Sequence, residues 1–237
     1  MTVRVQKPST FAQYVTLLRK DLQREFRTRD MLSSMAIYAF LVLVVYGAAL
    51  SQTGSQFDIL QMSGGMLWAL IVFTSLLGLN RSFSYEKEDG CLEGILLVPL
   101  DRSVVFLAKA TSNFLFLLAV EIVVLPLYYF FFLTTTTPQP TWPLMLIPML
   151  VGTIGIAGIG TLLSTITTST RGKDVLLAVL FIPMVFPLLY ACVSATTVVV
   201  AGGDIEGIFR NSVLLAVGYD LVMVLLSWVL YDYAVSA

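Results

Sequence analysis

The stretch VLLAVLFIPMVFPLLYACVSATTVVV, residues 175–200, contains no charged residue. A helix that crosses the hydrocarbon core of a bilayer needs about 20 mostly apolar residues, so this stretch is long enough to span a membrane. It lacks the alternation of apolar and polar residues that characterises the strands of a membrane-spanning barrel. The stretch therefore predicts a transmembrane helix.

Five more stretches of the chain have the same character. The 237-residue chain is 57% hydrophobic and 12% charged, whereas soluble domains are roughly 45–50% apolar and about 25% charged. We therefore expect an all-α integral membrane protein with six transmembrane helices, forming one membrane domain over residues 1–237. The chain becomes apolar only after a long segment with charges of both signs, so we expect no cleaved secretory signal. The other five predicted spans are 31–50, 59–79, 111–133, 143–165 and 212–231.

The distribution of basic residues predicts the orientation of these spans. Of the 14 lysine and arginine residues, all but Arg210 lie before span one, between span two and the start of span three, or after span four. Basic residues are concentrated in the cytoplasmic loops of membrane proteins. Both chain termini are therefore expected in the cytoplasm.

Residues 9–30 have the pattern of an amphipathic helix that lies in the membrane interface. An apolar face is opposed by a basic face, and such a helix places its apolar side toward the acyl chains. It is either a static anchor beside the first span or a mechanical element that moves. The apolar face consists of Phe11, Tyr14, Val15, Leu18, Leu22 and Phe26, and the basic face of Lys20, Arg24 and Arg27.

The composition argues against an enzyme. The chain has no histidine, which removes the commonest general base and metal ligand. Cys91 and Cys192 have neither metal-site nor disulfide spacing, and the phosphate-binding pattern G-x-x-x-x-G-K-[ST] is absent. We expect no catalytic residue, no metal site and no nucleic-acid partner.

Two carboxylates fall inside predicted spans, Glu121 in span three and Asp220 in span six. A buried charge is costly unless it is paired, hydrated or neutralised, so intramembrane acids are candidates for a functional role. The alternative is a structural role, in which each acid is protonated or hydrogen-bonded and holds neighbouring helices together.

Two further patterns concern helix packing. Pro183 and Pro187 each remove a backbone donor from span five, which gives either a static kink or a hinge. The run GTIGIAGIG, residues 152–160, places small residues along span four. Small residues let helices approach closely, within one chain or between two.

The segment SYEKEDGCLEGILLVPLDRS, residues 84–103, interrupts the apolar pattern between spans two and three. Its apolar residues recur at the spacing of one helical face, and its acidic residues cluster near the start of the segment. A short helix of this kind can place its apolar face in a groove of a soluble partner, while its acidic side chains contact basic residues at the rim of that groove. The alternative is an acidic loop that stays solvated. The predicted coupling residues are Glu86, Glu88, Asp89, Gly90, Leu92, Glu93, Ile95 and Pro99.

Residues 86–100 resemble the coupling segment of exporter-type ABC permeases, in which an acidic pair, a glycine, Leu-Glu and Pro-Leu recur between spans two and three. More narrowly, the chain is similar to the heme-exporter permease B family of the cytochrome c maturation system. The further matching features are VVFLAKA at 104–110, the glycine run of span four and the paired prolines of span five. The resemblance extends from about residue 17 to the C-terminus.

The resemblance implies a permease subunit, in the bacterial inner (plasma) membrane, of an ABC transporter in c-type cytochrome biogenesis. It implies a soluble ATPase partner that binds ATP and Mg, and a second copy of this permease in a homodimer. It also implies a membrane protein that presents heme outside and a heme chaperone that ATP hydrolysis releases. The chain itself would bind no cofactor, and heme would be the possible substrate of the complex.

Two other functions are compatible with the same pattern. One is an ABC-2-type permease for a drug, a lipid or a polysaccharide, and the other is a membrane assembly scaffold without transport activity. A neighbouring ATPase gene would separate both permeases from the scaffold. Neighbouring heme-chaperone genes would then favour the heme-exporter reading.

Overall fold

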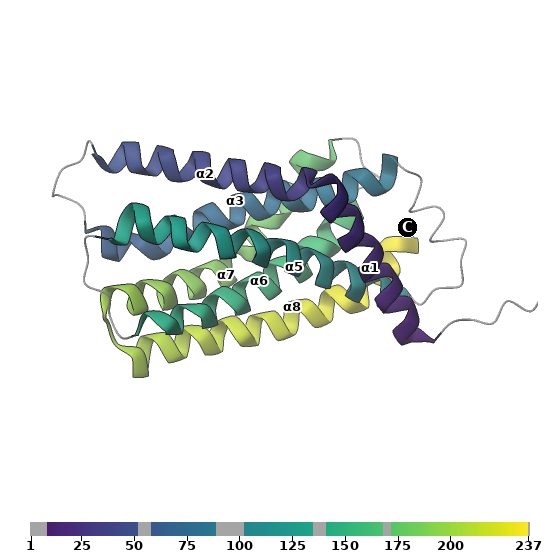
Figure 1. Ribbon diagram of the computed structural model, residues 1–237. Coiled ribbons are helices and arrows are strands. Elements are labelled where there is room, and N and C mark those ends of the chain that lie inside the picture. Colours follow the sequence, from purple (N-terminus) through teal and green to yellow (C-terminus); the bar gives the residue numbers. More distant parts are fainter. Residues whose placement is uncertain (1–8, 52–57, 89–101, 135–140, 168–171, 237) are drawn as a thin grey trace, which may run out of the picture.

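The computed structural model describes residues 9–51, 58–88, 102–134, 141–167 and 172–236, and these residues form a bundle of long helices (Figure 1). A short π-helical turn, Tyr129–Leu133, continues α5, while Trp142–Met145 and Ile205–Phe209 lead into α6 and α8. The α-helices are α1 (Thr10–Thr28), α2 (Asp30–Ser51), α3 (Ile59–Glu88), α5 (Arg102–Tyr128), α6 (Leu146–Thr167), α7 (Lys173–Ala201) and α8 (Arg210–Ser236).

The structure confirms the predicted fold class, since six of its helices are long and apolar enough to cross a membrane. No strand occurs among the described residues. The helices are longer than the apolar stretches, because a helix continues into the polar interface after its apolar sequence has ended. These spans are Asp30–Ser51, Ile59–Ser82, Arg102–Leu133, Trp142–Thr167, Val175–Ala201 and Ile205–Tyr231.

Helix α6 lies at the centre of the bundle, in contact with α3, α5, α7 and α8. In an apolar 18-residue window of its span, 72% of the residues are buried inside the protein, against 22% in the corresponding window of α2 and 17% in that of α8. Glycines make this central position possible: an added Cβ at Gly152 would lie 2.1 Å from the Trp68 ring of α3. The small residues of α6 therefore serve helix packing within the chain.

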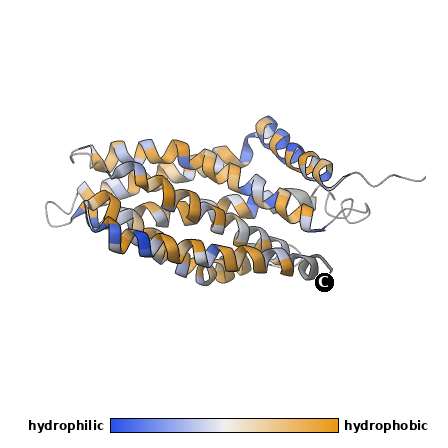
Figure 2. Cartoon of the chain, turned by 90° about the horizontal axis from the view of Figure 1, so that it is seen from below, coloured by the Kyte–Doolittle hydropathy of each residue, from blue (hydrophilic) through white to orange (hydrophobic). Residues whose placement is uncertain are grey.

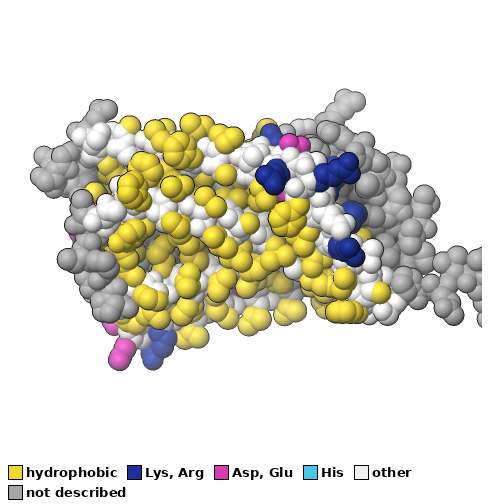
Figure 3. Space-filling view, in the orientation of Figure 1, with side chains coloured by type: hydrophobic (Ala, Val, Ile, Leu, Met, Phe, Trp, Pro, Cys, Tyr) yellow, Lys and Arg dark blue, Asp and Glu magenta, His cyan; other side chains and the backbone are white. Residues whose placement is uncertain are grey.

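Side-chain polarity follows the long axis of the bundle. Hydrophobic side chains cover the middle of the face seen in Figure 3, and basic side chains gather at the end that carries α1. Arg210 begins α8 at the opposite end. The orientation of the bundle in the membrane stays a prediction, which this separation of charges supports.

Helix α1 crosses the end of the bundle at a steep angle to the spans and carries both hydrophilic and hydrophobic residues (Figures 1 and 2). Its turn into α2 is made by Arg29, which has a φ of 56° and donates its backbone N–H to Glu25. The Glu25 carboxylate in turn accepts a hydrogen bond of 2.8 Å from the Leu32 N–H in the first turn of α2. The carboxylate thus satisfies a donor that α2 leaves unpaired at its N-terminus, and fixes the angle between the two helices.

Phe11 and Phe26 of α1 are 75% and 70% exposed, so part of its apolar face points away from the bundle. This exposure is compatible with a helix that rests in lipid on that side. The location of α1 in the membrane interface remains a prediction.

Candidate functional site

The predicted coupling segment lies between α3 and α5 in the chain, and the end of α3 and the start of α5 are at the end of the bundle that α1 crosses (Figure 1). Glu86 and Glu88 fall in the last turn of α3, which ends at Glu88, and α5 begins at Arg102. The segment between these helices lies outside the described residues. It contains the predicted coupling residues Asp89, Gly90, Leu92, Glu93, Ile95 and Pro99.

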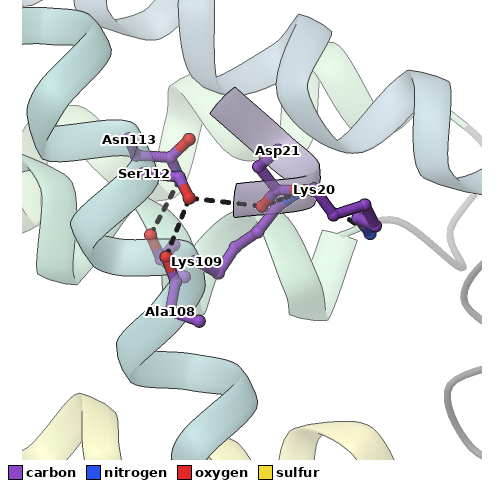
Figure 4. Close-up of polar contacts among 7 residues, drawn as sticks. Lys20, Asp21, Ala108, Lys109, Ser112 and Asn113 are labelled. Carbon is purple, nitrogen blue, oxygen red and sulfur yellow. Dashed lines mark hydrogen bonds and ion pairs between the residues drawn. The ribbon is translucent and has the colours of Figure 1, made fainter. Parts of the chain in front are cut away.

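The first turns of α5 are held against α1 by a cluster of polar side chains, which we name the Asp21 cluster (Figure 4). It consists of Lys20 and Asp21 from α1 and Lys109 and Ser112 from α5. The Asp21 carboxylate lies 3.5 Å from Lys109 Nζ and 3.4 Å from Lys20 Nζ, and accepts a hydrogen bond of 3.3 Å from Ser112 Oγ. The Lys109 and Asp21 side chains are only 8% and 11% exposed, so this ion pair is largely removed from water.

Two further features belong to the same junction. Tyr14 of α1 donates its hydroxyl to Thr111 of α5 at 3.1 Å. A cavity of about 50 Å³ lies beside the cluster and is bordered by Arg24, Glu25 and Ser82 as well as by Asp21 and Lys109. The contacts place α1 on the helix that directly follows the coupling segment.

Asp21 and Lys109 are not among the site residues predicted from sequence. Lys109 is one of the basic residues that predict the orientation of the spans. The available signal was its position in VVFLAKA, where a lysine follows five apolar residues near the start of a span. A charge in such a place needs a partner, but the pattern does not say which one.

The two predicted intramembrane acids are both buried against α6. Glu121 is 4% exposed, and its Oε1 lies 2.7 Å from the hydroxyl oxygen of Thr153. Asp220 is 6% exposed and lies against the backbone of Gly155, where an added Cβ would come 2.0 Å from its Oδ1. Each acid thus joins its own helix, α5 or α8, to the central helix.

These acids do not form a pair. Thr153 and Gly155 are two positions apart on α6, which turns the contact points by about 200° around the helix axis. Glu121 and Asp220 therefore approach α6 from opposite sides at a similar depth. The arrangement provides two separate buried carboxyl groups rather than a shared carboxylate site.

Other polar side chains inside the spans were not anticipated from sequence. Asn113 donates to Thr161 Oγ1 at 2.9 Å, and Trp68 donates to Thr196 Oγ1 at 2.9 Å. Tyr128 donates its hydroxyl to the Ser63 carbonyl at 3.0 Å. These bonds connect α5 to α6, α3 to α7 and α5 to α3, as expected where a polar group in hydrocarbon must find a partner.

The predicted hinge residues Pro183 and Pro187 are exposed on α7, which continues from Lys173 to Ala201 through both of them. Between them, the Met184 carbonyl accepts a hydrogen bond from the Tyr219 hydroxyl of α8. Whether the prolines make a static kink or a hinge stays open as a prediction. Among the described residues, no group of three or more His, Cys, Asp and Glu side chains could hold a metal ion.

The model of the CcmB protein family matches residues 12–236. The chain belongs to the CcmB family. Among its relatives, heme exporter protein B of Pseudomonas aeruginosa is 27% identical over 174 residues, which cover 73% of this chain and 75% of that protein. Heme exporter protein B of Rhodobacter capsulatus is 27% identical over 176 residues, or 73% and 77% of the two chains. The Escherichia coli K12 protein of the same name is 27% identical over 180 residues, or 76% and 79%.

The CcmB match includes the coupling segment, the Asp21 cluster and both intramembrane acids. It begins inside α1, so the helix that crosses the bundle end belongs to the matched region. The relatives are matched over three quarters or more of their own length, which is compatible with a shared six-span architecture.

Proposed function

We propose that this CcmB-family chain is the permease subunit of a heme-exporting ABC transporter in c-type cytochrome biogenesis. The observation that carries the proposal is the family match over residues 12–236, together with relatives named heme exporter protein B. Six apolar helices of spanning length fit a multi-pass protein of the bacterial inner membrane.

The proposal includes a separate soluble ATPase that binds ATP and Mg and docks on the coupling segment. The chain has no phosphate-binding motif of its own, so ATP hydrolysis would reside in that partner. The apolar face formed by Leu92, Ile95 and Pro99 would fill a groove of the ATPase, and the acids around Glu88 and Asp89 would meet basic residues at its rim. The end of α3 and the start of α5, which flank the segment in the chain, lie at the basic end of the bundle, and this supports the role.

A displacement of the coupling segment would reach the rest of the protein through α5. This helix starts where the segment ends and is joined to α1 by the Asp21 cluster. It is joined to α6 by the bond that Asn113 donates to Thr161 and by the bond that Glu121 accepts from Thr153. Packed helices with specific polar contacts move as connected bodies rather than deforming locally. Helix α5 is therefore the proposed transmission element.

The proposal further includes a homodimer of permeases, a membrane protein that presents heme outside, and a heme chaperone whose release is coupled to ATP hydrolysis. Because the chain has no histidine, we assign the ligation of heme iron to those partners. This subunit would couple ATP-driven movement to heme export or to chaperone release.

Deletion of the gene tests the proposal. We expect covalent heme attachment to c-type cytochromes to be lost, while b-type cytochromes persist and the heme chaperone accumulates in its loaded form. The readouts are heme staining of membrane proteins and the heme content of the purified chaperone. Normal c-type cytochromes in the deletion strain, with export of a drug or lipid impaired instead, would contradict the proposed substrate.

A further inference from the structure

A cavity of about 240 Å³ lies toward the end of the bundle opposite α1 (Figure 1). Its walls are formed by the end of α5 with the π-helical turn that continues it, by the turn that leads into α6 with the first residue of that helix, and by the end of α7. All of its lining residues fall inside helices that are long and apolar enough to cross a membrane. The cavity is therefore expected at membrane depth, at the opposite end of the spans from the helix ends that flank the predicted coupling segment.

The cavity occurs where neither α5 nor α6 is a regular α-helix. The chain forms a π-helical turn over Tyr129–Leu133 and a 3₁₀-helical turn over Trp142–Met145, which contains Pro143. A 3₁₀ turn is tighter than an α-helix and a π turn is looser, so the side chains of these two turns do not interdigitate as those of two regular helices do. Tyr129 and Trp142, which both line the cavity, meet in an edge-to-face contact with ring centroids 5.1 Å apart. This contact holds the two turns together beside the cavity.

The walls of the cavity select an apolar occupant. Among the described residues that line it, none is charged, and its surface is almost wholly apolar. The Tyr128 hydroxyl donates to the Ser63 carbonyl at 3.0 Å, so this polar atom is already satisfied within the protein. Apolar cavities stay dry, and one of about 150 Å³ is large enough for benzene. Sites for drug-sized ligands have roughly 300–1,000 Å³, so the size of this cavity fits a narrow apolar group better than a broad planar one.

The lining residues include both surface and core side chains. Tyr129 and Leu146 are 37% and 58% exposed, whereas Tyr128 and Val200 are 1% and 2% exposed. The cavity thus extends from the surface that would face lipid to side chains of the core. At membrane depth this surface is surrounded by acyl chains, which are narrow, apolar and present at high concentration.

We propose that this cavity is a binding site for one acyl chain of a membrane lipid, which enters between the end of α5 and the start of α6 and reaches Tyr128 and Val200. An empty apolar cavity leaves its walls without contacts on one side, so a chain that fills it adds dispersion contacts to α5, α6 and α7 together. The site needs neither heme nor an ATPase. It rests on the predicted membrane location of the spans and goes beyond the proposed function.

Photo-cross-linking of the full-length chain in nanodiscs tests the occupant. The probe is a phosphatidylethanolamine that carries a diazirine in one acyl chain, and peptide mass spectrometry locates the adducts. We expect adducts on the buried Tyr128 and Val200 as well as on Phe130, which is 67% exposed and contacts lipid in any case. Adducts confined to exposed residues would overturn the proposal, because the lipid would then contact only the outer surface. If added hemin removes the adducts on the two buried residues and leaves that on Phe130, the site belongs to heme and the proposed occupant is wrong.

Variants that fill the cavity test its location. Val200→Phe and Leu125→Phe enlarge lining side chains of α7 and α5, and we expect each to abolish the adduct on Tyr128 while that on Phe130 remains. The matched control is Val123→Phe on α5, which is 52% exposed and does not line the cavity, and it should keep both adducts.

Thermal unfolding gives a second readout for the same variants. A ligand that binds only the folded state raises the melting temperature. When lipid is returned to delipidated protein, we expect a smaller rise for the two filled variants than for the wild type and the control. Equal rises in all four proteins, or an undiminished Tyr128 adduct in both filled variants, would refute the site. None of these variants depends on heme export, so their failure would leave the proposed function untouched.

Discussion

Single glycine residues decide how closely the neighbours of α6 can approach it. At Gly152, an added Cβ would lie 2.1 Å from Cη2 of Trp68, far inside the contact distance of two carbon atoms. Trp68 is 1% exposed and donates its indole N–H to Thr196 of α7 at 2.9 Å. A methyl group at position 152 would therefore displace the indole ring and disturb the hydrogen bond to a third helix.

We expect Gly152→Ala to destabilise the protein by about 1–3 kcal/mol, the usual cost of forcing an extra carbon into a packed core. The matched control is Gly218→Ala on α8, where an added Cβ meets no atom within 4 Å. Because alanine favours a helix over glycine, the control is expected to gain up to about 1 kcal/mol. Thermal unfolding in detergent, followed by tryptophan fluorescence, measures both. Equal melting temperatures for the two variants would contradict this account of α6 packing.

At the scale of whole helices, the junction joins α5, the helix that follows the predicted coupling segment in the chain, to α1, which is predicted to lie in the membrane interface. The Asp21–Lys109 ion pair is nearly enclosed, and the energetics of enclosed ion pairs are asymmetric. Removing one partner leaves a charge without compensation, whereas removing both can be nearly neutral. This asymmetry distinguishes a structural ion pair from a solvated surface contact, whose loss would cost only about 0–1 kcal/mol.

We therefore expect Asp21→Asn to be the most damaging change in the cluster, with a loss of up to about 3–5 kcal/mol, because it removes the carboxylate that lies 3.5 Å from the buried Lys109 ammonium. Lys109→Met is expected to be milder, since Lys20 remains beside Asp21. The double variant should recover part of the loss. Melting temperatures of the four proteins form the required cycle. Strictly additive effects of the two substitutions would rule out a coupled pair.

The six spans could be predicted because each apolar run is a local property of the sequence. The contacts between spans could not, since Trp68 and Thr196 are 128 positions apart and no local pattern links them. Glu121 and Asp220 were found because a carboxylate is conspicuous in an apolar run. Their placement on opposite sides of α6 depends on the rotation of three helices, which the runs of apolar residues do not specify. The Asp21 cluster was missed for the same reason, because its partners come from different helices.

The coupling segment offers a test of its predicted apolar face. We expect Leu92→Asp to abolish co-purification of the ATPase, because it places a charge at the centre of the proposed contact. Val98→Asp is the matched control, since position 98 falls off the face formed by Leu92, Ile95 and Pro99 on a helix. Charge reversal at Glu88 or Asp89 should be mild, as exposed pairs contribute about 0–1 kcal/mol. Normal ATPase recovery with Leu92→Asp would refute docking through this face.

The distribution of charge over the whole molecule predicts its orientation. Among the described helices, α1, the end of α3, the start of α5 and the end of α8 lie at one end of the bundle (Figure 1). That end carries most of the basic side chains seen in Figure 3. Since the basic loops of membrane proteins stay in the cytoplasm, this end and both termini should face inward.

Cysteine labelling can decide the orientation directly. In a background in which Cys91 and Cys192 are replaced by serine and alanine, single cysteines would be placed at Thr53, at Thr137 and at Glu88. We expect a membrane-impermeant maleimide to label the first two in intact spheroplasts and to reach position 88 only after permeabilisation. The reason is that loops without basic residues are translocated to the outside of the membrane. The segment after span two has Arg81, Lys87 and Arg102 in or beside it, so we expect it to stay in the cytoplasm. Labelling at position 88 from outside would invert the topology and would place the proposed coupling segment out of reach of any cytoplasmic ATPase.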